Sequence, residues 1–154
     1  RLRKVAIGKT IFLAFVWMYV TTVLPVIVSS QSWNNSFTLY AISRYFFIYC
    51  ICILFDYRDR DDDKAEGVKS LITFLSEKNI TRLYFFSWLV YVMATIALAE
   101  HSFSSMSITL LLLPGLILVF IHNYARRHFS DMLYYVILDG LMALSAILML
   151  VAGI

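Results

Sequence analysis

Five long apolar segments, separated by short polar stretches, constrain the fold of this 154-residue chain more than any other feature. Hydrophobic residues make up 61% of it, well beyond the composition of ordinary soluble domains. A helix rises about 1.5 Å per residue and satisfies its own backbone hydrogen bonds, so each segment is long enough, or nearly so, to cross a bilayer. The sequence therefore predicts an all-α, multi-pass membrane bundle with spans at Thr10–Ser29, Thr38–Phe55, Leu83–Ala99, Ser107–Ile121 and Leu133–Val151.

Basic residues alternate between the connections of these spans. Lysine and arginine precede the first span and lie in the second–third and fourth–fifth connections, whereas the connections at 30–37 and 100–106 carry neither. This alternation follows the positive-inside rule, which places basic connections on the cytoplasmic side. We therefore expect an integral membrane protein, most simply of a bacterial inner membrane, whose acidic segment after Phe55 is cytoplasmic. The net charge of +3 then reflects membrane orientation, and we expect no nucleic-acid partner.

The connection after the second span carries the densest charge in the chain. Asp56, Asp59 and Asp63 are spaced by three and four residues, which places their carboxylates on one face of a helix. Aligned carboxylates repel one another unless a cation lies among them, and Mg²⁺ accepts one or two carboxylates together with phosphate oxygens and water. The spacing predicts half of a Mg²⁺–diphosphate site. The alternative is a solvated loop whose acids pair with the neighbouring lysines and arginines.

The same run resembles the second aspartate-rich motif of the UbiA superfamily of membrane prenyltransferases. That motif reads Asp-x-x-x-Asp-x-x-x-Gly-(Ile/Val)-(Lys/Arg)-Ser, and it maps onto Asp59, Asp63, Gly67, Val68, Lys69 and Ser70. Asp56 matches an acid that many members carry three residues earlier. The motif itself covers residues 55–70, and the resemblance in the order of membrane spans covers the whole chain. It implies that residues 1–154 are the C-terminal part of a single domain, helices five to nine of a nine-helix bundle.

Members of this superfamily move a prenyl group from a diphosphate donor to an acceptor, usually an aromatic ring. The resemblance implies that Asp56, Asp59 and Asp63 bind Mg²⁺ against a prenyl diphosphate, and that Asp59, Asp63 and Lys69 are catalytic. It also implies a lipophilic acceptor, contact with membrane lipid, and partnership with N-terminal helices that would carry the first aspartate-rich motif. We expect these 154 residues alone to be inactive, because they would supply half of the site.

Five further side chains are candidates for substrate binding: Arg58, Arg60, Tyr45, Tyr49 and Ser70. The arginines can neutralise charge that develops on a departing diphosphate, and salt bridges to nearby acids are the alternative. The tyrosines share a helical stripe with Asp56, so their ring faces can stabilise an allylic carbocation from the membrane side. Packing within the membrane is the alternative for them. The apolar residues of the run 71–75 predict a short surface helix that can cover the bound ligand.

Two charged residues lie inside the predicted spans, where a charge is costly unless it is paired or hydrated. Arg44 and Asp139 lie at different depths, so we expect Glu100 to be the partner of Arg44. Asp139 either faces a central cavity or makes a structural hydrogen bond.

Two other classes of protein remain open from the sequence. A non-catalytic transporter or scaffold would use the acidic run to bind a divalent cation or a partner. A lipid phosphotransferase is a weaker alternative, because that chemistry usually shows Asp-Gly-x-x-Ala-Arg, which this chain lacks. A second aspartate-rich segment between two apolar spans, upstream of Arg1, would favour the prenyltransferase over both.

Overall fold

The computed structural model of the chain is a bundle of five long helices, and it describes residues 7–65, 67, 70–101 and 103–153. These described residues include no β-strand. The predicted all-α membrane fold is confirmed, because five helices are long and apolar enough to cross a bilayer: Gly8–Val28, Asn35–Arg58, Glu77–His101, Ser105–Ala125 and Met132–Val151. The third span begins at Glu77 rather than at Leu83, because the helix continues through polar residues beyond its apolar part.

The first span consists of three consecutive helical pieces. α1 (Ile7–Met18) is followed by a π-helical turn (Tyr19–Val23) and by α2 (Leu24–Val28). The π-helical turn ends at Val23, two residues before Pro25, which has no N–H to donate to the regular helical ladder. The wider turn therefore allows the span to pass the proline and continue to its end.

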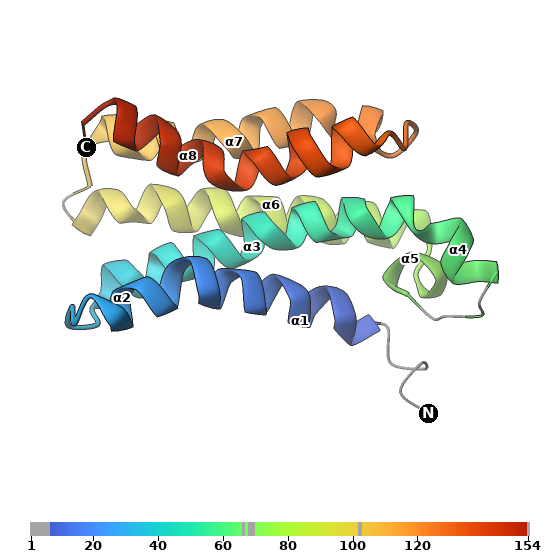
Figure 1. Ribbon diagram of the computed structural model, residues 1–154, viewed down its shortest axis with the longest axis horizontal. Helices are drawn as coiled ribbons and strands as arrows, with labels where there is room; N and C mark the ends of the chain where they lie inside the picture. The colour runs from blue at the N-terminus through green and yellow to red at the C-terminus, as the bar shows by residue number, and fades with distance from the viewer. Residues whose placement is uncertain (1–6, 66, 68–69, 102, 154) are drawn as a thin grey trace.

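The second span leads into the acidic run. α3 (Asn35–Arg58) begins where the Asn34 side chain accepts a hydrogen bond from the Phe37 N–H over 3.1 Å. After the helix ends, α4 (Arg60–Ala65) and α5 (Leu71–Phe74) follow as two short helices at one end of the bundle (Figure 1). The short surface helix expected near residues 71–75 is thus present.

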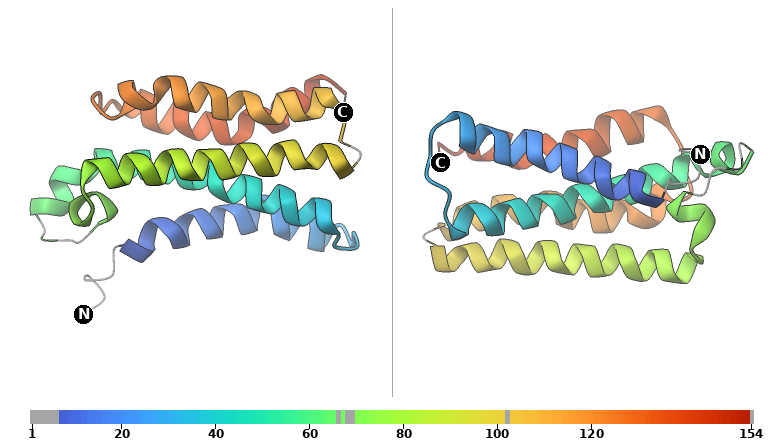
Figure 2. Two further views of the ribbon diagram at one scale, coloured as in Figure 1. Left: turned by 180° about the vertical axis from the view of Figure 1, so that it is seen from behind. Right: turned by 90° about the horizontal axis from the view of Figure 1, so that it is seen from below.

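Three further helices complete the bundle. α6 (Glu77–Ala97) ends in a 3₁₀ turn, and α7 (Ser105–Ala125) returns antiparallel to it. A π-helical segment (Met132–Leu138) then leads into α8 (Asp139–Val151). Figures 1 and 2 show three layers: α7 with α8, α3 with α6, and α1 with α2.

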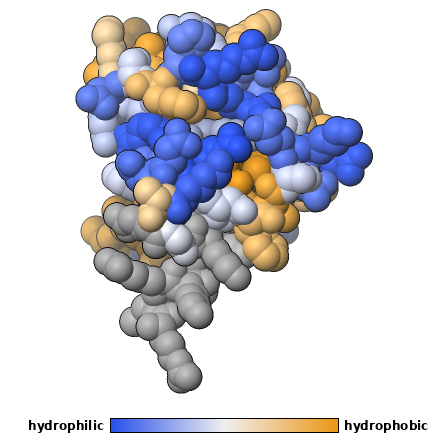
Figure 3. Space-filling view, turned by 90° about the vertical axis from the view of Figure 1, so that its right-hand side faces the viewer, coloured by the Kyte–Doolittle hydropathy of each residue, from blue (hydrophilic) through white to orange (hydrophobic). Residues whose placement is uncertain are grey.

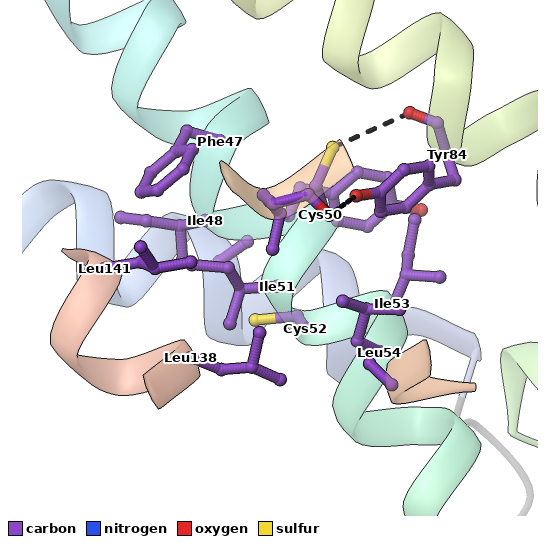
Figure 4. Close-up of a cluster of buried hydrophobic side chains, with 14 of the residues drawn as sticks. Phe47, Ile48, Cys50, Ile51, Cys52, Ile53, Leu54, Tyr84, Leu138 and Leu141 are labelled. Atoms are coloured by element: carbon purple, nitrogen blue, oxygen red, sulfur yellow. Dashed lines mark hydrogen bonds between the residues drawn. The ribbon is translucent and has the colours of Figure 1, made fainter. Parts of the chain in front are cut away.

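α3 is the central helix of the bundle. In the most apolar 18-residue stretch of this helix 61% of the residues are buried, whereas the corresponding stretch of the first span is 17% buried. Figure 4 shows the core around its middle, where Phe47, Ile51 and Leu54 lie near Tyr84 of α6 and Leu141 of α8. This packing fixes the position of the acidic end of α3 relative to its neighbours.

The outer surface of the bundle is apolar. Phe12 of α1, Phe120 of α7 and Leu150 of α8 are 66%, 83% and 80% exposed, and many other large apolar side chains are exposed on the same helices. An apolar surface this extensive is stable in contact with lipid rather than with water. Burial and helix length therefore agree on a protein inserted in a membrane.

The polar side chains concentrate at one end of the bundle. Glu77 lies 3.4 Å from Arg60 and 3.7 Å from Arg126, which joins the α3–α4 region to the ends of α6 and α7. Figure 3, which views this end of the molecule, shows hydrophilic residues covering much of it. The basic connections that the sequence predicted to share one side of the membrane thus lie together.

Cysteine labelling tests this arrangement. We expect Lys64→Cys and Arg127→Cys to react with a membrane-impermeant thiol reagent from one side of sealed vesicles, and Asn35→Cys from the other. All three positions are exposed, whereas the native Cys50 and Cys52 are buried, so the background reaction is low. Labelling of Asn35→Cys and Arg127→Cys from the same side would contradict the arrangement of the spans.

Candidate functional site

The acidic end of α3 borders a cavity of about 270 Å³ between α1, α3 and the start of α8. Its polar lining combines three carboxylates, two cations and a hydroxyl: Asp56, Asp59, Asp139, Lys9, Arg58 and Thr10. Its apolar lining includes Leu13, Trp17, Ile51, Phe55 and Met142. The cavity therefore places charged groups next to an apolar surface that faces the membrane interior.

The Asp56 carboxylate is held by the neighbouring helix. The Thr10 hydroxyl of α1 donates a hydrogen bond to Asp56 Oδ2 over 2.6 Å, and Thr10 is only 2% exposed. This bond fixes the direction of the carboxylate and leaves its other oxygen available. Lys9, which also lines the cavity, brings a positive charge to the same wall.

Asp59 is paired with the arginine beside it in the chain. Arg58 Nε lies 2.8 Å from Asp59 Oδ1, so the salt bridge that the sequence left as an alternative is present. The Arg58 guanidinium also lies over the rings of Phe55 and Tyr135, at 5.1 and 4.8 Å from their centroids. Its Nη1 is buried without a hydrogen-bond partner. Arg58 is thus held rigidly at the cavity wall and keeps a donor to offer.

Asp63 does not line the cavity, although its carboxylate lies within electrostatic range of Asp56. The helix is interrupted at Asp59, whose φ of −82° and ψ of 2° end α3, and Asp63 belongs to the separate helix α4. Its N–H donates to the Asp59 carbonyl over 2.9 Å, but its side chain is outside the cavity lining. The break at Asp59 thus places Asp63 on a separate short helix outside the cavity lining, but the backbone bonds of Asp59 and Asp63 keep helical spacing and Asp63 stays within electrostatic range of Asp56.

The donor set fits Mg²⁺ only as an ion shared with a ligand. Among the described residues, no three histidine, cysteine, aspartate or glutamate side chains converge closely enough to hold a metal ion by themselves. Asp56 and Asp59 remain at the cavity, and each has one oxygen engaged by Thr10 or Arg58. Mg²⁺ takes one or two carboxylates and fills its other positions with phosphate oxygens and water, so two carboxylates suffice where a diphosphate completes the shell.

Neither of the two tyrosines proposed from the helical stripe lines the cavity. Their rings stack at a centroid distance of 6.0 Å, but Tyr49 is buried in the core and Tyr45 lines a different groove with Phe15 and Met18. The reason is that α1 packs across this stripe of α3. The aromatic rings that do line the cavity are those of Trp17 and Phe55.

Two other sequence candidates, Arg60 and Ser70, do not line the cavity. Arg60 lines a separate polar cavity with Arg126. Ser70 is 4% exposed at the start of α5, and its hydroxyl lies 3.3 Å from that of Thr73. Lys69, like Val68, falls outside the described residues. The described residues of α5 do not line the cavity, and Phe74 is exposed on that helix.

Asp139 reaches the cavity from α8. Of its two expected roles, the structure shows the first, because the side chain lines the cavity and no described residue donates a hydrogen bond to it. The π-helical segment ends at Leu138, directly before this residue, and such segments often position functional side chains. The sequence marks Asp139 as an intramembrane charge, whereas Thr10 and Trp17 carry no sequence signal that links them to Asp56.

The expected pairing of Arg44 with Glu100 is wrong. Arg44 instead donates to the Met142 carbonyl over 2.7 Å and to the Ser145 hydroxyl over 3.4 Å, because α8 passes beside it. It lines a second cavity of about 390 Å³ that shares Trp17, Ile48, Asp139 and Met142 with the first. The two cavities adjoin along α3, from the acidic end toward the middle of the membrane.

Comparison with known proteins adds no relative: no protein-family model, curated protein or solved structure matches the chain. The fold and the site themselves define the class: a multi-pass helical membrane protein with an acidic cavity at one end of its central helix.

Proposed function

We propose that this chain is the part of a membrane prenyltransferase that binds the prenyl diphosphate donor. The observation that carries the proposal is the cavity at the end of α3, where Asp56, Asp59, Lys9 and Arg58 meet a wall containing Trp17. A prenyl diphosphate has the same division, with a charged head and an apolar tail. The resemblance of the run 55–70 to the aspartate-rich motif supports the same chemistry.

The residues of the cavity have distinct roles in this proposal. Mg²⁺, when bound, supplies positive charge that stabilises the departing diphosphate. Lys9 and Arg58 add positive charge at the same place, and Thr10 orients the Asp56 carboxylate. Trp17 and Phe55 exclude water from the reacting carbon and present ring faces to positive charge that develops on it.

The adjoining cavity around Arg44 offers a place for a lipophilic, aromatic acceptor that enters from the bilayer. It is lined by Tyr40, Trp17 and Ala146 as well as by Arg44, so it combines apolar surface with a fixed cation. The proposal places the acidic end of the bundle in the cytoplasm, where a diphosphate donor and Mg²⁺ are available, in accordance with the positive-inside rule. Upstream helices would supply the first aspartate-rich motif.

Turnover of a prenyl diphosphate tests the function directly. In phospholipid vesicles, we expect the full-length protein to release pyrophosphate from a prenyl diphosphate when Mg²⁺ and an aromatic acceptor are present, and to stop when the metal is chelated. A coupled pyrophosphate assay and mass spectrometry of the acceptor measure this. Equal binding of a prenyl alcohol and its diphosphate, with no release of pyrophosphate, would favour the non-catalytic transporter or scaffold.

A further inference from the structure

A polar cavity distinct from the two described above lies at the acidic end of the bundle, on the other side of α3. Its volume is about 320 Å³, and residues from the α3–α4 junction, the start of α6 and the end of α7 line it: Tyr57, Arg60, Glu77, Asn123, Arg126 and Arg127. It shares no lining residue with the cavity of Asp56 and Asp59. α6 and α7, which bound it, lie in front in the left view of Figure 2.

The charge of this cavity is positive. Its lining contains three arginines and one glutamate, so the formal sum is +2. Glu77 is shared between Arg60, at 3.4 Å, and Arg126, at 3.7 Å, so one carboxylate serves two guanidinium groups. Both contacts are long for charge-assisted hydrogen bonds, which are usually about 2.7–2.9 Å. The arginines therefore keep capacity to bind a further anion.

Several donors in the cavity wall are buried without an acceptor. The Nε atoms of Arg60 and Arg126 are buried and have no hydrogen-bond partner, and the hydroxyl of Tyr57, which is 3% exposed, has none to receive its proton. Buried donors in folded proteins almost always have a hydrogen-bond acceptor, because a donor without one loses its hydrogen bonds to water and gains none in the protein. Three such donors around one positive cavity indicate a ligand that is rich in acceptor oxygens.

The arginines are also held in place. The Arg126 guanidinium lies 4.7 Å from the centroid of the Tyr57 ring, and its Nη1 is 3.4 Å from the Thr81 hydroxyl. A guanidinium that is fixed in one plane presents parallel donors, which match two oxygens of a phosphate group. Lysine-like point charges on flexible stems would not provide this match.

We propose that this cavity binds a phosphate group, and that the source is the headgroup of an anionic phospholipid. The position favours a lipid, because the cavity lies where α3 and α7 leave the apolar part of the bundle, with the half-exposed Phe129 in its wall. Free phosphate has the same binding chemistry and is the second source that an experiment must separate. The proposal gives Arg60 a role outside the donor cavity, independent of prenyl transfer.

Lipid binding to the purified full-length protein tests the proposal. We expect native mass spectrometry to detect phosphatidic acid bound with an affinity about tenfold higher than that of phosphatidylcholine, and Arg126→Gln to remove this preference. Arg82→Gln is the matched control, because Arg82 is an exposed arginine of α6 outside the cavity, and it should bind both lipids as the unsubstituted protein does.

A second substitution keeps the test informative if Arg126→Gln does not fold. Tyr57→Phe removes only the unsatisfied hydroxyl and retains the ring under Arg126, so it should fold and should weaken phosphatidic acid binding several-fold. Displacement of the lipid by millimolar inorganic phosphate, with the same dependence on Arg126 and Tyr57, would assign the site to free phosphate and reject the lipid source. Equal losses in Arg126→Gln and Arg82→Gln, or no effect of Tyr57→Phe, would overturn the proposal.

Discussion

Replacing Asp56 or Asp59 with asparagine is expected to reduce prenyl transfer by about 10²-fold or more while the bundle stays folded. Both carboxylates line the cavity at the end of α3, and either substitution removes a negative oxygen that Mg²⁺ requires without changing side-chain size. Asparagine at position 56 can still accept the hydrogen bond from Thr10, so the contact between α1 and α3 is retained. Pyrophosphate release measures the activity, and circular dichroism with size-exclusion chromatography measures the fold.

The matched controls lie on α4. Asp61 and Asp62 are exposed and outside the cavity, so Asp61→Asn and Asp62→Asn make the same change of charge and should retain nearly full activity. Normal turnover in both Asp56→Asn and Asp59→Asn would end the catalytic interpretation of the site.

A substitution at Asp63 distinguishes the site predicted from the motif from the site defined by the cavity lining. The resemblance to the aspartate-rich motif makes Asp63 a catalytic metal ligand, so Asp63→Ala should abolish transfer. In the structure, however, the Asp63 side chain does not line the cavity. Because Asp63 lies within electrostatic range of Asp56, loss of activity in Asp63→Ala but not in Asp61→Asn would support the role that the motif gives it, and full activity in Asp63→Ala would reject that role.

Replacing Gly115 with alanine is expected to destabilise the bundle by about 1–3 kcal/mol, as overpacking of a tight interior usually does. A Cβ atom at Gly115 in α7 would collide with the ring of Tyr91 in α6. That ring cannot move freely, because Tyr91 is 3% exposed and its hydroxyl donates to the Leu111 carbonyl over 2.5 Å. Trp88 Nε1 also donates to the Gly115 carbonyl over 2.9 Å, so a shift of α7 would weaken a second interhelical bond.

Gly140→Ala is the matched control for this prediction. Gly140 lies within α8, and a Cβ atom there would meet nothing within 4 Å. Because alanine is a better helix former than glycine, Gly140→Ala should leave stability unchanged or raise it by up to about 1 kcal/mol. Thermal unfolding in one detergent compares the two variants, and equal stability of Gly115→Ala and the unsubstituted protein would contradict the close contact of α6 and α7.

The spans were predictable because their signal is local. Apolar composition over a helical length predicts a transmembrane helix wherever the segment packs, and the structure differs mainly in how far each helix continues into polar residues, as at Glu77. The grouping of the basic connections at one end was also predictable, since antiparallel spans place alternate connections together.

The candidate site was predictable only in part. Asp56 and Asp59 line the cavity, and Arg58 both pairs with Asp59 and borders the cavity, so neither of its two expected roles excludes the other. Tyr45 and Tyr49 share the helical stripe of Asp56 by spacing, yet spacing within one helix does not reveal which neighbouring helix covers the stripe. That neighbour is α1, and it directs Tyr45 to another groove.

By itself, the sequence determined the helices, their number and the collection of charge at one end, because these follow from the hydrophobicity and charge of neighbouring residues. Only the tertiary structure decided which side chains meet there. Thr10 reaches Asp56 across 46 residues, and Asp139 arrives from α8. Arg60 lies near Glu77 of α6 and lines the cavity on the other side of α3 together with Arg126. Such contacts depend on how helices cross and where one helix breaks, and these are set by the packing of side chains that are distant in the chain.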